Sequence, residues 1–376
     1  MQEFYRDTWA EIDLDAIAYN VKQIKDLHPT KSLFVVVKAN GYGHGDVEVS
    51  KTAIEAGADC LAVSGLDEAL RLRQSGITVP ILVLGMTRLK DVPLAASYNI
   101  SLTAHDSMWI EQLVALPLKE TVKVHLKVDS GMHRLGLTDI EQVITCFENL
   151  QKAPMVEIEG IFTHMSTADC DKDYLSYQVE NFKRLIKDLD LSDVKYIHLE
   201  NTATLLQQEF EFDHGIRLGL GLYGINPDEE FIPIQFKLKP ALKLFSNIVQ
   251  IKQLKKGDKV GYGATYEASE AEWIGVVPIG YADGWIRLHQ GRRVIVNGFE
   301  CEIVGRVCMD QMMIRLPQPF PMGTIVTLIG EGMPVERVAR EIGTISYEIL
   351  CLISDRVPRV YKKGDEVIAV KKMRFE

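Results

Sequence analysis

The segment LFVVVKANGYGHG, residues 33–45, is the most informative about the fold, because it joins an apolar run to a polar, glycine-rich turn. A short, continuous apolar run such as 33–37 is typical of a strand buried on both faces in a parallel sheet. Lys38 follows directly, at the strand end where barrel enzymes place their reactive side chains. Apolar surroundings favour the neutral amine of a lysine, and a neutral amine can form a Schiff base. The glycines that follow allow the backbone to turn sharply and to approach a ligand closely.

Seven further apolar runs predict strands parallel to the first one. They lie at 60–64, 81–84, 100–103, 122–128, 156–162, 196–199 and 213–218. Helical periodicity occupies most of the gaps, at 47–56, 66–74, 106–116, 140–149 and 174–189. A poorer helix is expected at 90–97, where Pro93 interrupts the pattern unless it lies in the first turn.

Repeated βα units of this kind predict an α/β fold with a closed (β/α)8 barrel of the TIM type. A doubly wound open sheet is the competing fold. That fold normally carries the fingerprint GxGxxG after its first strand, and GYGHG does not match it. The sequence therefore favours the barrel.

The hydrophobic periodicity changes in the stretch 225–244, which contains Pro227, Pro233 and Pro240. Beyond it, strand-like runs lie at 242–253, 273–278, 293–296, 301–304, 312–316 and 324–329, with one short helix at 335–342. We therefore predict a barrel domain over residues 1–235 and a mainly β C-terminal domain over 236–376. In this division the barrel domain begins with a strand-like stretch at 9–14 and an amphipathic helix near 15–27.

Composition and charge exclude several classes of protein. The net charge of −10 argues against a general nucleic-acid binder, which usually presents a basic face. No apolar stretch approaches the roughly 18 residues that span a bilayer, and the acidic N-terminal region lacks the apolar core of a signal peptide. Six cysteines without a CxxC pair fit reduced thiols better than a disulfide framework or a zinc site. We expect a cytoplasmic protein without a bound metal and with neither a membrane nor a nucleic acid as partner.

Polar residues at predicted strand ends could share one barrel mouth, namely Lys38, Lys127 with Asp129, His164, Asn201 and Arg217. The motif VVKANGYGHG around Lys38 resembles the lysine motif of alanine racemases, which bind pyridoxal 5'-phosphate (PLP). The same family pattern recurs in order as KVDSGMHRLG, FTHMSTAD, RLGLGLYG, VGYGATY, GYADGW, CMDQ and SYE, across nearly the whole chain. The resemblance implies an isomerase that interconverts L-alanine and D-alanine through a PLP external aldimine, supplying D-alanine for bacterial cell-wall peptidoglycan.

The resemblance also implies which residues form the site. The family's catalytic residues match Lys38, Tyr262, Arg217 and His164. Its cofactor contacts match Lys38, Tyr42, Arg134, His164, Asn201, Thr202, Arg217, Gly219, Leu220 and Tyr347, and its substrate contacts match Arg134, Met309, Tyr281 and Asp310. Among the cofactor contacts, the phosphate is expected to meet Tyr42, Thr202, Tyr347 and the backbone amides of Gly219 and Leu220. Amide groups of a glycine-rich turn suit a dianion, so this assignment makes physical sense.

Two of the implied roles carry the chemistry. Racemisation needs a base on each face of a planar carbanion, and the family supplies Lys38 and the tyrosine that matches Tyr262. A phenol with an ordinary pKa of about 10 is a poor base, so it needs cationic neighbours, which the family supplies through His164 and Arg217. Arg217 matches the arginine that faces the pyridine nitrogen. An arginine can only donate, so the nitrogen should stay unprotonated, which disfavours transamination and leaves proton removal and return at Cα.

Further implications concern the partner subunit and the neighbouring residues. In the family, the residues that match Tyr262, Met309 and Asp310 reach the PLP of the partner subunit, so the resemblance implies a homodimer with shared active sites. A narrow, polar substrate corridor is matched by Tyr281, Arg287 and Asp169, and Tyr347 limits the size of the substrate side chain.

Lys127 and Arg134 match a family pair in which the lysine can be carbamylated. A buried lysine facing an arginine would be a repulsive pair, and a carbamate makes the pair attractive. His133, beside them, occupies a position where many relatives have glycine.

Other functions are weaker alternatives. A serine-preferring or broad-specificity PLP racemase is the runner-up, and Tyr347 at the size-limiting position argues against it. A related PLP-dependent decarboxylase should carry a signature different from VGYGATY and CMDQ in its β domain. A PLP-carrying regulatory protein would lack the domain that bears Tyr262, and a Schiff-base aldolase would not need the motif RLGLGLYG.

Overall fold

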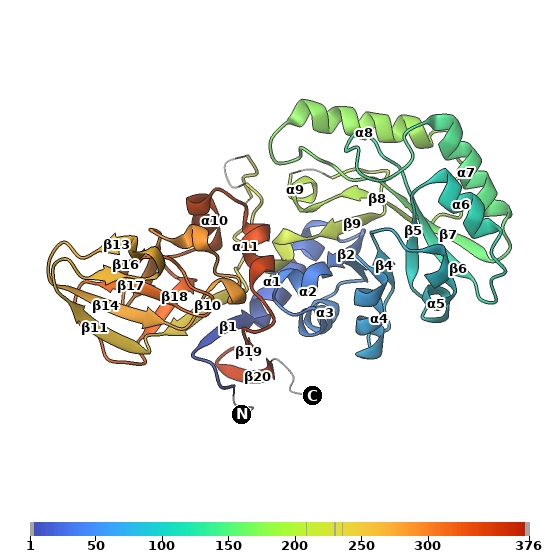
Figure 1. The fold of residues 1–376 in the computed structure, drawn as a ribbon. Helices are drawn as coiled ribbons and strands as arrows, with labels where there is room; N and C mark the ends of the chain where they lie inside the picture. Colours follow the sequence, from blue (N-terminus) through green and yellow to red (C-terminus); the bar gives the residue numbers. More distant parts are fainter. Residues whose placement is uncertain (1–3, 208, 229–230, 235, 373–376) are drawn as a thin grey trace. The chain divides into compact units, whose positions relative to one another are not determined.

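The computed structural model describes residues 4–207, 209–228, 231–234 and 236–372 (Figure 1). The chain divides into two compact units, which we call the barrel unit and the sheet unit. The barrel unit comprises Ala16–Gly41 and Asp46–Pro240, and the sheet unit comprises Met1–Asp15, Tyr42–Gly45 and Ala241–Glu376. The short segment Tyr42–Gly45 therefore groups with the C-terminal part of the chain, although it directly follows the Lys38 turn in sequence.

The barrel unit is a closed barrel of parallel strands, as the apolar runs predict. In the described residues its strands are β2 (Ser32–Val36), β3 (Cys60–Val63), β4 (Ile81–Val83), β5 (Ser101–Ala104), β6 (Val122–Lys127), β7 (Val156–Phe162), β8 (Tyr196–Glu200) and β9 (Gly215–Leu218). Each pairs with the next, and β9 pairs with β2 to close the ring. The runs are apolar because most of their residues are fully buried. The predicted α/β barrel class is confirmed.

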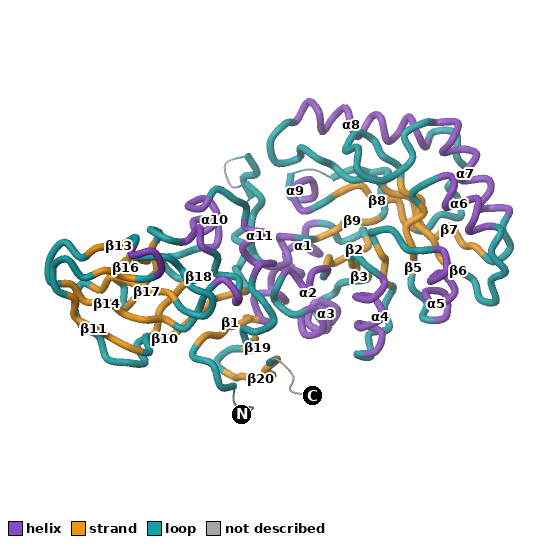
Figure 2. The backbone as a smooth tube through the Cα atoms, viewed as in Figure 1, coloured by secondary structure: helices purple, strands orange, loops and turns teal. Residues whose placement is uncertain are grey.

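Helices lie on the outer side of the barrel strands (Figure 2). They are α1 (Leu14–Leu27), α3 (Asp46–Glu55), α4 (Leu66–Gln74), α5 (Val92–Ser97), α6 (Ser107–Val114), α7 (Ile140–Lys152), α8 (Lys172–Ile186) and α9 (Thr202–Leu205). Three of them begin at an aspartate whose side chain accepts a backbone N–H of the first turn, namely Asp106, Asp139 and Asp171. Pro93 lies in the first turn of α5, where its missing N–H is tolerated.

The sheet unit is mainly β, as predicted. Its described part contains a ten-stranded sheet in the order β11 (Gln250–Leu254), β14 (Glu272–Val277), β17 (Met312–Leu316), β16 (Phe299–Val304), β15 (Arg293–Val296), β18 (Ile325–Ile329), β10 (Leu242–Asn247), β1 (Thr8–Asp13), β19 (Arg359–Lys363) and β20 (Glu366–Lys371). A two-stranded sheet pairs β12 (Lys259–Val260) with β13 (Tyr266–Glu267), and two helices follow, α10 (Val335–Ile342) and α11 (Ser346–Leu352).

Strand β1 accounts for the main difference from the predicted ranges 1–235 and 236–376. It pairs antiparallel with β10 and parallel with β19, so the N-terminal strand belongs to the sheet unit. Local alternation predicts such a strand, whereas its partners lie far away in the sequence. Further along the chain, the barrel unit ends at Pro240 and the sheet unit resumes at Ala241. Residue 235, where we predicted the boundary, lies outside the described residues.

Within the described residues, no helix combines the length and the apolar character that crossing a bilayer would require.

Candidate active site

Lys38 lies two residues after β2 and begins a turn of left-handed backbone. Ala39, Asn40 and Gly41 have φ values of 53°, 53° and 60°, in the region that residues other than glycine rarely occupy. Helix α4 supports this turn, because Glu68 accepts the N–H of Ala39 at 2.7 Å and Arg71 donates to the Asn40 amide oxygen at 3.1 Å. The turn thus holds the half-buried Lys38 at the C-terminal end of the barrel strands.

Arg217, the third residue of β9, is 2% exposed and donates to several acceptors at this end of the barrel. Its guanidinium donates to the carbonyl oxygens of Thr163 at 2.8 Å, His198 at 3.0 Å and Leu199 at 3.1 Å. It also contacts two imidazole nitrogens, Nδ1 of His198 at 2.6 Å and Nδ1 of His164 at 3.2 Å. These contacts fix the guanidinium plane.

The charge of Arg217 is not matched by a direct partner. Among the described residues no carboxylate forms an ion pair with it, and Asp213 and Glu200 act only through their electrostatic field. Burial lowers the pKa of Arg217 to about 10, so the guanidinium still carries its proton near neutral pH. Arg217 is therefore a buried, permanently donating cation.

Lys127 and His164 are driven toward their neutral forms. Lys127, the last residue of β6, is 8% exposed, and its Nζ lies 4.3 Å from the centre of the Phe162 ring. Burial and the charges of Arg217 and Arg134 hold the pKa of Lys127 well below its ordinary value. Burial, followed by the charge of Arg217, likewise lowers the pKa of His164 well below its ordinary value, and the charge of Lys38 acts in the same direction. Five of the predicted residues, Lys38, Lys127, Arg134, His164 and Arg217, therefore share one electrostatic environment.

Asp129 organises the loop that carries Arg134. Its carboxylate accepts the backbone N–H groups of Gly131 at 2.9 Å, His133 at 3.0 Å and Arg134 at 3.0 Å. Burial raises the pKa of Asp129, but these hydrogen bonds outweigh it and the net shift is downward. His133 has a φ of 55°, which is left-handed backbone that glycine adopts without strain. This fits the glycine that many relatives have at this position.

The predicted phosphate contacts of the barrel unit are joined by hydrogen bonds. Asn201, directly after β8, caps α9 by accepting the Thr204 N–H at 3.1 Å. The neighbouring Thr202 accepts the N–H of Gly219 on its Oγ1 at 2.8 Å. Leu220 begins the 3₁₀ turn that follows Gly219. The structure therefore brings Thr202 together with the start of the motif RLGLGLYG.

The sheet unit carries other predicted residues on exposed loops. Tyr262 is 72% exposed and lies between two glycines with left-handed backbone, Gly261 and Gly263. Tyr281 and Met309 are 43% and 53% exposed. Three side chains predicted to act at a substrate site thus point away from the core of their own unit.

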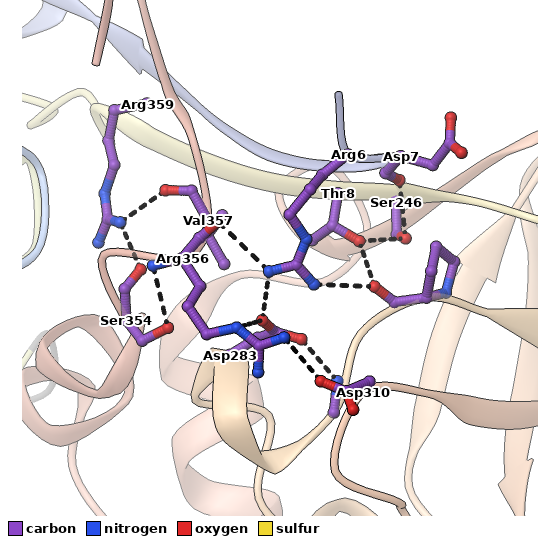
Figure 3. A network of polar contacts seen from close by, with 12 residues as sticks. Arg6, Asp7, Thr8, Ser246, Asp283, Asp310, Ser354, Arg356, Val357 and Arg359 are labelled. Carbon is purple, nitrogen blue, oxygen red and sulfur yellow. Dashed lines mark hydrogen bonds and ion pairs between the residues drawn. The ribbon is translucent and has the colours of Figure 1, made fainter. Parts of the chain in front are cut away.

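A buried carboxylate links the loops of Tyr281 and Asp310 (Figure 3). Asp283 is 1% exposed and accepts Arg6 at 2.6 Å, while the guanidinium of Arg356 lies 3.6 Å away. Arg356 also pairs with Asp310 at 2.6 Å. The backbone N–H of Tyr281 donates to the carbonyl of Cys308 at 3.0 Å, which ties the two loops together.

Tyr42 and Tyr347, both predicted phosphate contacts, lie side by side in the sheet unit. Their ring centres are 5.8 Å apart at an interplanar angle of 48°. Burial raises the pKa of Tyr42, so its hydroxyl keeps its proton and can donate to an anion.

Arg359 fastens the segment that contains Tyr42. The fully buried guanidinium donates to the Gly43 carbonyl at 2.9 Å and to the carbonyls of Ile353, Ser354 and Val357 at 2.6, 2.5 and 2.7 Å. It therefore joins the residue after Tyr42 to the segment that follows α11.

Two family models match the chain, the N-terminal domain of alanine racemase over residues 12–227 and its C-terminal domain over residues 241–361. The alanine racemase of Anoxybacillus flavithermus is 48% identical over 378 residues, which cover 98% of both chains. The chain belongs to the alanine racemase family. It is therefore an enzyme of the isomerase class.

Further comparisons extend this alanine racemase assignment to the fold. The alanine racemase of Geobacillus kaustophilus is 46% identical and covers 99% of this chain and 98% of its own. The crystal structure of alanine racemase from Bacillus anthracis with bound L-Ala-P has a TM-score of 0.94 at 44% identity, covering 98% of both chains. Fold and family thus agree over almost the full length.

Sequence reasoning missed His198 and Arg359 in this alanine racemase. His198 interrupts the otherwise apolar core of β8, YIHLE, and a histidine inside a buried strand is a signal that could have drawn attention to it. Arg359 follows Pro358 near the C-terminus, where its sequence carries no sign that the side chain is buried.

Proposed function

We propose that this alanine racemase interconverts L-alanine and D-alanine with PLP as cofactor and with Lys38 and Tyr262 as the two bases. Bound PLP withdraws electrons from the substrate and makes its Cα–H acidic. The product D-alanine would serve bacterial cell-wall peptidoglycan. The observation that carries the proposal is Arg217, a buried cation held at the same end of the barrel as Lys38.

The polar groups of the barrel mouth suit PLP. Lys38 supplies the amine for covalent attachment, and Arg217 supplies a donor for the ring nitrogen. Thr202 and the amides of Gly219 and Leu220 would hold the phosphate, together with the protonated hydroxyl of Tyr42 and with Tyr347. Asn201, Arg134 and His164 complete the proposed cofactor contacts.

Arg217 selects the reaction. Because it remains protonated and carries no proton that it can give away near pH 7, it would donate a hydrogen bond to the ring nitrogen of the cofactor without protonating it. Such a donor would limit how far the cofactor draws electrons from Cα, so that a proton removed there by the chain's bases would be returned to Cα. This favours racemisation over transamination.

Tyr262 returns or removes the proton on the face opposite Lys38, and we place it at the cofactor of a partner subunit. Its 72% exposure, with the exposed Tyr281 and Met309, supports a homodimer in which these residues and Asp310 complete the partner's site. Arg134 joins them as a substrate contact.

Lys127 is a candidate for carbamylation. The neutral amine favoured by its buried surroundings can add carbon dioxide, and the resulting carbamate would attract Arg134. Lys127, Asp129, Arg134 and His164 line one small space, so Arg134 is a neighbour of Lys127.

We assign the enzyme to the cytoplasm and alanine as its substrate. All six cysteines are free, which suits a reducing compartment. Tyr347, by its size, would exclude larger amino acids, which argues against the serine-preferring alternative.

The first test is covalent attachment of the cofactor. The purified enzyme should show a PLP absorbance band that borohydride reduction removes, with the label on the peptide that contains Lys38, and should racemise both enantiomers of alanine. Lys38→Ala should lose both properties, whereas Lys51→Ala, at an exposed position of α3, should keep them. A label on another lysine with near-normal turnover would refute the assignment.

The second test separates two bases from one. Tyr262→Phe removes only the hydroxyl and should slow racemisation in both directions by ~10²–10⁴-fold. Solvent-deuterium exchange at Cα should survive in one enantiomer, the one whose Cα–H faces Lys38. Comparable residual exchange in both enantiomers, read separately by NMR, would refute the two-base mechanism.

A further inference from the structure

Four polar side chains form a continuous hydrogen-bonded chain through the interior of the barrel. It begins at Arg217, whose guanidinium lies 2.6 Å from Nδ1 of His198. Nε2 of His198 lies 2.8 Å from Nδ1 of His125, and Nε2 of His125 lies 3.1 Å from a carboxylate oxygen of Glu159. All four are at most 4% exposed. The chain joins strands β9, β8, β6 and β7.

The chain has a single possible direction when both imidazoles are neutral. Arg217 only donates, so Nδ1 of His198 accepts and its ring hydrogen lies on Nε2. That hydrogen goes to Nδ1 of His125, whose own hydrogen must then lie on Nε2 and point at Glu159. Burial lowers the pKa of both histidines, which keeps the rings neutral. Each donor therefore points away from the mouth, toward Glu159.

The barrel core is shaped around the two rings. The ring of His198 stacks between Phe34 and Phe162, with centre distances of 5.0 and 4.7 Å and interplanar angles of 14° and 6°. Gly160 faces the ring of His125, where a Cβ would come within 2.7 Å of Cε1. A larger residue at position 160 would collide with the ring. The imidazoles therefore have little freedom to flip.

Glu159 ends the chain as a fixed acceptor. Ser101 donates to the same carboxylate oxygen at 2.5 Å, and the Lys123 ammonium lies 3.7 Å from the other oxygen. Burial raises the pKa of Glu159, but the contacts of His125, Ser101 and Lys123 outweigh it and lower the pKa to about 2. The carboxylate is thus ionised at and around neutral pH.

We propose that Glu159 and His125 are positioning residues for the racemisation reaction, acting on Arg217 through His198. A guanidinium that only donates at one end and a carboxylate that only accepts at the other fix the tautomer of each ring, and His198 thereby presents an acceptor to Arg217. The guanidinium is thereby held in one orientation at the mouth of the barrel. The inference rests on the proposed role of Arg217 toward the cofactor.

The direct test reads the histidine rings of the full-length enzyme. Ring ¹⁵N–¹H spectra at pH 7, assigned with single His→Gln variants, should show His125 and His198 neutral, with the hydrogen on Nε2 in both. A charged ring, or a hydrogen on Nδ1 of either residue, would overturn the proposal. This measurement requires neither substrate turnover nor bound cofactor.

The variant Glu159→Gln tests the consequence for catalysis. Its amide can donate or accept, so the acceptor end of the chain is no longer enforced, and a fraction of Nδ1–H tautomer should appear in His125, whereas His198 stays held by Arg217. We expect kcat to fall by about 10–100-fold while KM stays within about twofold, because alignment at the reacting centre is lost. Glu157→Gln is the matched control, since it removes the same charge from an exposed position two residues earlier on β7.

The possible results are distinguishable. Equal kcat and equal ring tautomers in Glu159→Gln and Glu157→Gln would overturn the positioning role. If Glu159→Gln does not fold, Glu159→Asp replaces it, where a lowered kcat supports the proposal and an unchanged kcat overturns it. A wild-type enzyme that shows the ring pattern but fails to racemise alanine would refute the proposed function and leave the hydrogen-bonded chain intact.

Discussion

Replacement of Arg359 by methionine should destabilise the sheet unit strongly. The side chain makes four hydrogen bonds to the carbonyls of Gly43, Ile353, Ser354 and Val357, all from a buried cation. Hydrogen bonds of charged groups contribute about 1.5–3 kcal/mol each, so the four supply roughly 6–12 kcal/mol. Burying the guanidinium costs several kcal/mol, which offsets part of this. The net loss in the free energy of unfolding should be about 3–5 kcal/mol.

Urea unfolding followed by tryptophan fluorescence measures this loss. With an m-value of about 2 kcal/mol/M, the midpoint of Arg359→Met should fall by roughly 1.5–2.5 M. Arg359→Lys keeps the charge but not the planar fork, so its midpoint should lie between those of methionine and wild type. Arg293→Met, at an exposed ion pair with Glu300, is the control and should cost at most about 1 kcal/mol. A midpoint for Arg359→Met equal to that of the control would refute the reasoning.

Two further predictions concern a backbone position and a buried acid. His133→Gly should raise the free energy of unfolding by about 0.5–1 kcal/mol, because glycine adopts the left-handed backbone of this position without strain. His133→Ala keeps a Cβ and should not raise it. Equal urea midpoints for the two variants would contradict this reasoning. Burial and the neighbouring Glu200 raise the pKa of Asp213 to about 7, although Lys31 opposes the shift. Because the unfolded pKa is about 3.9, the folded protein holds an extra proton between these values, so this contribution to stability is full below about pH 4 and is lost as pH rises through 7. Asp213→Asn should therefore flatten the fall in urea midpoint between pH 5 and pH 8, and an unchanged slope would argue against it.

The sequence predicts the barrel well because strands buried on both faces must be apolar throughout. The runs at 81–84 and 156–162 coincide with β4 and β7 to within a residue. The prediction of one strand over 242–253 was wrong, because this segment forms two strands, β10 and β11, with a turn around Ile248 between them. Helix α11 and strands β19 and β20 were not predicted at all.

The positions of the site residues at strand ends can be predicted from the sequence, whereas the contacts of their side chains cannot. Lys38, Lys127 and Arg217 can be placed at strand ends by counting apolar runs. Whether Arg217 meets a carboxylate or an imidazole depends on which side chains of β8 face inward, and a bulge between His198 and Glu200 changes that alternation. Tertiary support likewise decides the left-handed turn after Lys38, because the stabilising Glu68 belongs to another helix.

The position of β1 has a consequence for the order in which the protein can fold during synthesis. Thr8 bonds to Ser246, 238 residues later, and Glu11 pairs with Lys362, 351 residues later. At about 5–20 residues per second, a ribosome needs roughly 12–50 s to make the first partner strand and roughly 18–70 s to reach the second. All the strands of the barrel, from 32 to 218, are complete before either partner exists. The barrel can therefore close while β1 has no strand to pair with. The sheet unit cannot be completed until β19, near the C-terminal end of the chain, has left the ribosome.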